Sequence, residues 1–99
     1  MTGKVKKIKD VPEVEIGANE PVFTTGVVCR LLDVPVWVLK QLDSEGIVSP
    51  RRENENQPRL YSKKELSLVK HCWYYLSEHR VKIHGLKVIL RMEQGDLEI

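Results

Sequence analysis

The sequence lacks a long hydrophobic run and has few of the residues that mark specialised classes of protein. Its 99 residues include two cysteines and one phenylalanine, and aromatic residues make up 6% of the chain. No apolar stretch approaches the roughly 18 residues of a membrane span, and no signal-peptide core is recognisable. Hydrophobic residues at 41% and charged residues at 30% are typical of a soluble protein. We expect one small cytoplasmic domain with a single core and no membrane partner.

The few cysteines and histidines make neither a disulfide framework nor a metal site. Cys29 and Cys72 are expected to be free thiols, because nothing marks the chain as secreted. His71, Cys72, His79 and His84 invite a metal hypothesis, but their spacing gives no tetrahedral set. No nucleophile–base pair, phosphate-binding glycine loop or paired acids stand out. We therefore expect no metal, no cofactor and no enzyme activity.

The net charge is also small, +2, so its distribution is more informative than its sum. Residues 21–92 carry 12 Lys and Arg against 7 Asp and Glu. Residues 1–20 show almost no sustained periodicity of hydrophobic residues, which predicts a flexible arm; a docked strand at residues 14–16 is the alternative. We expect the folded domain at 21–93 and an acidic tail at 94–99.

Two short helices are predicted in the first half of that domain. Thr24 or Thr25 caps a helix over 25–32, in which apolar residues recur on one side. A second helix over 36–45 begins after Pro35 and ends before Gly46. Its valines and tryptophan are mediocre helix formers, so packing must override local preference.

A hairpin and two more helices follow. The segment 51–61 alternates charge around a polar centre and predicts a β-hairpin with its tip at 54–57. Ser62-Lys63-Lys64-Glu65 is a capping box that opens a helix over 63–79. A last helix is predicted over 83–93. The fold class is therefore mainly α, a winged helix-turn-helix of two helices, a hairpin wing and two further helices.

Three motifs give this pattern a family resemblance. They are "VFTTGVVCRLLDV", "LDSEGIVSPRR" and "RLYSKKEL", and together the similarity covers residues 21–92. The sequence resembles the DNA-binding domain of MerR-type transcription regulators. The segment "HRVKIHGLKVILRME" and the order Lys40-Gln41-Leu42-Asp43 are similar to the HspR heat-shock repressor branch of that family.

The resemblance implies a sequence-specific DNA-binding regulator, a repressor, with 36–45 as recognition helix and 51–61 as wing. Lys and Arg neutralise phosphates and Gln can hydrogen-bond a base edge, which agrees with that assignment. An apolar pair, Val36 and Trp37, could meet thymine methyl groups. The predicted DNA-contacting residues are Thr24, Thr25, Val36, Trp37, Lys40, Gln41, Arg51, Arg52, Arg59, Tyr61 and Lys63.

The start of the recognition helix departs from the family pattern. Pro35 stands where family members usually have a polar cap, and Trp37 and Val38 stand where polar residues are usual. Three roles remain open for Trp37: packing on the core or wing, direct DNA contact, or binding another protein.

The chain also ends at Ile99, without the long dimerisation helix of full-length relatives. It is expected to be either a trimmed piece of a longer regulator or a natural minimal regulator. Its expected location is the cytoplasm, at the bacterial nucleoid. Assembly would be a homodimer or side-by-side copies on double-stranded DNA, and the HspR resemblance implies a DnaK-type chaperone as co-regulator. Two other functions stay open: a helix-turn-helix used as a protein-interaction module, and an excisionase-like architectural factor.

Overall fold

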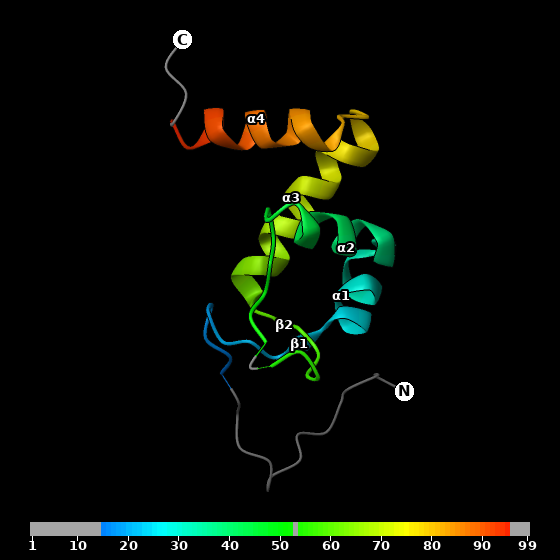
Figure 1. Cartoon of the computed structure of the whole chain (residues 1–99). Helices are drawn as coiled ribbons and strands as arrows, with labels where there is room; N and C mark the ends of the chain where they lie inside the picture. The colour runs from blue at the N-terminus through cyan, green and yellow to red at the C-terminus, as the bar shows by residue number, and fades with distance from the viewer. Residues whose placement is uncertain (1–14, 53, 96–99) are drawn as a thin grey trace, which may run out of the picture.

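The computed structural model describes residues 15–52 and 54–95, which are mainly helical (Figure 1). α3 forms the long axis, α1 and α2 lie to one side of it, and α4 crosses its C-terminal end (Figure 1). The helices predicted over 25–32 and 83–93 are confirmed, and those predicted over 36–45 and 63–79 each end one residue earlier. The elements in chain order are β1 (Phe23–Thr24), α1 (Thr25–Leu32), α2 (Val36–Ser44), β2 (Leu60–Tyr61), α3 (Lys63–Glu78) and α4 (Ile83–Glu93).

The turn between α1 and α2 is closed by backbone hydrogen bonds. Thr24 is the N-cap of α1, and its hydroxyl accepts a hydrogen bond from the Val27 N–H at 3.3 Å. Asp33 ends the helix in the left-handed region, φ 52°, which Asp tolerates better than most residues. The next residue, Val34, is buried and its N–H donates to the Cys29 carbonyl. These contacts fix the angle at which α2 leaves the turn.

α2 is a helix because its buried side outweighs its strand-like composition. Val38, Leu39 and Leu42 are fully buried on the side that faces the other helices. Gly46, at φ 70°, then ends the helix, and its N–H donates to the Asp43 carbonyl. The core around these side chains contains Val28, Val34, Val38, Leu39, Leu42, Val48, Tyr61, Val69, Cys72 and Leu86.

The strand pairing of segment 51–61 differs from the predicted hairpin. β2 pairs antiparallel with β1, so that Tyr61 lies opposite Phe23. In the described part of the segment, residues 51–52 and 54–59 form a loop with a turn at 54–57 rather than a first strand. The polar sequence of this loop offers no apolar side to bury, whereas Phe23 packs beside the core next to Tyr61. The predicted hairpin was therefore wrong in its partner strand.

The start of α3 has the predicted capping box. The Ser62 hydroxyl accepts from the Glu65 N–H at 3.2 Å, and the Glu65 carboxylate accepts from the Ser62 N–H at 2.9 Å. The Ala18 carbonyl accepts from the Lys64 N–H at 3.0 Å, which brings the end of the predicted arm to this helix. Residues 1–14 of that arm lie outside the described residues, and Glu15 and Ile16 of the alternative strand are not in a strand.

Side-chain contacts hold α4 against α3 and α2. Glu93 accepts hydrogen bonds from His71 and Tyr75 of α3, at 2.8 Å and 2.9 Å. These two partners lower the pKa of the Glu93 carboxyl. Lys87 pairs with Glu45 at 2.9 Å, which connects α4 to the end of α2. No helix in the described part of the chain combines the length and apolar composition of a membrane span.

Candidate nucleic-acid interface

One side of α2 faces solvent along the whole helix. Its residues follow the helical spacing i, i+1, i+4, i+5 and i+8 and are all exposed. Val36 is 48% exposed and Trp37 is 58% exposed. Trp37 is therefore not part of the buried core, so core packing is removed from the roles that the sequence left open. We call this set the α2 face: Val36, Trp37, Lys40, Gln41 and Ser44.

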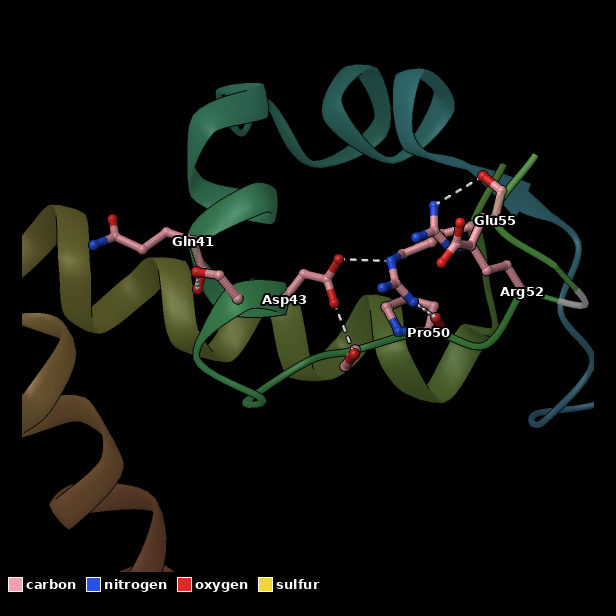
Figure 2. Close-up of polar contacts among 8 residues, drawn as sticks. Gln41, Asp43, Pro50, Arg52 and Glu55 are labelled. Atoms are coloured by element: carbon pink, nitrogen blue, oxygen red, sulfur yellow. Dashed lines mark hydrogen bonds and ion pairs between the residues drawn. The ribbon is translucent and has the colours of Figure 1, made fainter. Parts of the chain in front are cut away.

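The α2 face changes in chemistry along its length. Its N-terminal end is apolar, while Lys40 supplies a positive charge and Gln41 an amide one turn later. Figure 2 shows the Gln41 side chain extending away from the polar cluster around Asp43. An amide presented in this way has both a donor and an acceptor available for a base edge. The predicted recognition residues of this helix thus lie together on one accessible surface.

Two of the predicted wing residues, Arg51 and Arg52, are exposed at the start of the loop. They line an open groove with Pro21, Pro58 and Leu60. The Arg52 guanidinium also donates to the Glu55 carbonyl across the loop at 3.5 Å, a long contact (Figure 2). Both positive charges are therefore accessible on the surface of the loop.

The other two predicted wing residues have partners inside the protein. The Arg59 Nε lies 2.6 Å from the Asp43 carboxylate, and that guanidinium also donates to the Pro50 carbonyl (Figure 2). Tyr61 is only 2% exposed, and burial is the main cause of its raised pKa. The side chains of Arg59 and Tyr61 are thus engaged within the protein at the end of the loop, whereas those of Arg51 and Arg52 are exposed.

The remaining predicted contacts lie at helix N-termini. Thr24 caps α1, so its hydroxyl already has one partner, and Thr25 is the first residue of that helix. Lys63 is the exposed first residue of α3. Backbone N–H groups and side chains at helix starts are common phosphate contacts, which is the role predicted for these three residues.

Sequence reasoning missed Asp43, which is the centre of the polar cluster in Figure 2. One of its carboxylate oxygens pairs with Arg59, and the other accepts a hydrogen bond from the Ser49 hydroxyl at 2.7 Å. An acid in the last turn of a helix opposes the helix dipole. That unfavourable placement was the available signal that Asp43 has a compensating partner.

Cysteines and histidines are the remaining side chains whose chemistry would suit metal binding or nucleophilic attack. Within residues 15–52 and 54–95, no group of three or more ligating side chains is close enough to hold a metal ion. Cys29 and Cys72 are both free thiols. Burial, with the nearby Glu93 charge, raises the pKa of Cys72 to about 11. Its reactive thiolate form is therefore rare at neutral pH.

Comparisons with known proteins bear on the same residues. A family model described as MerR HTH family regulatory protein matches residues 23–93, which include every helix and strand described above. The chain is also 26% identical over 85 residues to a Streptomyces coelicolor protein that carries the name heat shock protein HspR. That match covers 86% of this chain and 56% of the relative, so the chain spans little more than half of the relative's length.

Proposed function

Because the chain belongs to the MerR family of helix-turn-helix regulatory proteins, we propose that it is a transcription regulator that binds double-stranded DNA. In this proposal α2 enters the major groove with its exposed face, and the loop after it lies on the phosphate backbone as the wing. The observation that carries the proposal is the common exposure of Lys40 and Gln41 on the second helix of the motif.

Each exposed group has a distinct task in this arrangement. Lys40, Arg51 and Arg52 neutralise phosphates, and their binding releases counterions from the DNA. Gln41 forms paired hydrogen bonds with a base edge, for which adenine is the best geometric match. Val36 and Trp37 make apolar contact with thymine methyl groups at the start of the helix. Lys63 adds a phosphate contact from the start of α3.

The effect on transcription is proposed from the relative. The name of the similar Streptomyces coelicolor protein refers to heat shock, which suggests that the present chain represses genes of that response. A DnaK-type chaperone is the proposed co-regulator. We further propose that two copies bind side by side, because one small helix-turn-helix contacts only a short half-site.

A salt titration tests DNA binding. A duplex selected by the unmodified chain from a random-sequence library is titrated between about 50 and about 200 mM salt, a range over which phosphate contacts weaken strongly. Arg51→Ala and Arg52→Ala should each lower affinity and reduce the slope of log K against log salt by about 0.9. Binding that does not depend on salt, or a failure to select any duplex, would contradict the proposal. Ladder-like shifts on long DNA would instead indicate an architectural factor.

The exposure of Trp37 favours a second candidate, a protein-interaction module. A large aromatic side chain that is 58% exposed beside Val36 has the character of an interface anchor. This function predicts a protein partner whose binding is lost in Trp37→Ala and kept in Arg52→Ala. The same two variants tested on DNA separate the candidates, because Arg52→Ala should weaken DNA binding.

A further inference from the structure

Asp43 connects three segments of the chain with one carboxylate (Figure 2). It is the penultimate residue of α2, and it pairs with Ser49 of the following turn and Arg59 just before β2. Arg59 in turn donates to the Pro50 carbonyl. We call these four residues, Asp43, Ser49, Pro50 and Arg59, the Asp43 clamp. Asp43 and Arg59 are 22% and 27% exposed, so water only partly screens their attraction.

The clamp joins the two ends of the loop that carries Arg51 and Arg52. Pro50 precedes Arg51, and Arg59 is the last residue before β2, so the hydrogen bond between them joins the two ends of the loop. The ion pair between Arg59 and Asp43 then attaches these joined ends to α2. Without it, the loop would be held at its start by the buried Pro50 and at its end by the short β1–β2 ladder, and Arg51 and Arg52 could occupy more positions than they do with the clamp. The clamp thus sets where these charges lie relative to the α2 face.

The charge of Asp43 makes this role testable. A carboxylate at the C-terminal end of a helix opposes the helix dipole, and a negative charge beside a DNA-binding surface repels phosphate. Charge alone therefore predicts that removing it strengthens DNA binding. A positioning role predicts the opposite, because the loop arginines would lose their fixed placement.

On the basis of the proposed function, we infer that Asp43 is a positioning residue for DNA binding. Through Arg59 and Ser49 it holds the loop that carries Arg51 and Arg52 in a fixed position relative to the α2 face. It acts without touching the DNA. Arg59 then contributes through the clamp rather than as a phosphate contact of its own.

The test compares Asp43→Asn with Glu55→Gln on the selected duplex. Both variants remove one negative charge, but Glu55 lies on the loop outside the clamp. We expect Asp43→Asn to bind roughly tenfold more weakly, since a hydrogen bond to a charged group contributes about that much. Its salt slope should also become shallower, although the protein has gained net positive charge. Glu55→Gln should bind as tightly as the unmodified chain or more tightly.

Two further variants test whether the clamp acts as one unit, and circular dichroism controls for a folding defect. Ser49→Ala keeps both charges of the ion pair and should weaken binding less than Asp43→Asn does. The double variant Asp43→Asn/Arg59→Gln should bind no more weakly than the worse single variant, because both break one unit. Circular dichroism must show that each variant is folded. Tighter or unchanged binding by folded Asp43→Asn would overturn this inference alone, whereas no binding by the unmodified chain would overturn the proposed function and this inference with it.

Discussion

The two ends of α2 differ in what surrounds them. At the N-terminal end, Pro35 gives the helix no side-chain cap, and Val36 and Trp37 stand in solvent. At the C-terminal end, Asp43 is tied to Ser49 and Arg59, and Glu45 is tied to Lys87. The comparison indicates that α2 has a free end, whose exposed side chains are available for contact, and a fixed end, whose polar side chains are tied to other segments.

The largest expected effect separates the buried side of α2 from its free end. Leu42→Ala removes a fully buried side chain and should lower the free energy of unfolding by about 3 kcal/mol, within the range of about 2 to 5 for such changes. Trp37→Ala should change it by less than about 0.5 kcal/mol, because this side chain is exposed. Urea unfolding of both variants gives the two values. Similar losses in both would show that Trp37 is a core residue after all.

The next effect concerns the middle of the helix. Gln41→Ala should relax the base preference at one position of the site, with a loss of about 1 to 3 kcal/mol in discrimination. Lys40→Ala should weaken binding to all sequences about equally. Selection of duplexes by each variant from one random library measures both changes. An identical preference in Gln41→Ala and the unmodified chain would remove this residue from base recognition.

A smaller effect tests the apolar end of the α2 face. Replacing thymine by deoxyuridine removes only the C5 methyl group, so contact with Val36 and Trp37 should be worth about 0.8 kcal/mol, or about fourfold in affinity. The unmodified chain should lose affinity on the uridine-substituted duplex, and Trp37→Ala, which keeps Val36, should lose less. Equal losses in both proteins would assign the methyl contact to another residue.

Acid should weaken the contacts that hold α4 against α2 and α3, which is the smallest of the expected effects. The Lys87 ammonium lowers the pKa of Glu45, and His71 and Tyr75 lower that of Glu93. A carboxyl with a lowered pKa in the folded state stabilises the fold above its unfolded pKa, and this contribution is lost as pH falls through the folded value. Thermal melts below about pH 5 should therefore show less stability loss on acidification in Glu45→Gln and Glu93→Gln than in the unmodified chain. A parallel decline in all three proteins would contradict these ion pairs.

The helices could be predicted from sequence because their signals are local. The spacing of Val38, Leu39 and Leu42 outweighed the strand preference of α2, and the capping box located the start of α3 to the residue. The exposed α2 face follows from the same periodicity. The family motifs indicated that 36–45 is the helix that carries the DNA-contacting residues.

The strand partner and the clamp depend on contacts between distant segments. β2 pairs with Phe23–Thr24, more than thirty positions earlier in the chain, so the local alternation in 51–61 pointed to the wrong partner. Arg59 and Tyr61 resemble wing contacts in sequence, but packing places one in an ion pair and the other in the core. Burial and pairing of this kind are settled only by the three-dimensional arrangement.

Contact between the free end of α2 and DNA can be measured directly through the fluorescence of Trp37. The chain has two tryptophans, so in the Trp73→Phe variant Trp37 is the only source of tryptophan fluorescence. Acrylamide quenching of this variant is measured with and without the selected duplex. If this end of α2 lies against DNA, saturating duplex should strongly reduce the quenching of Trp37. Quenching that stays unchanged while the duplex is bound would show that this end of α2 remains in solvent, and would contradict DNA contact by Trp37.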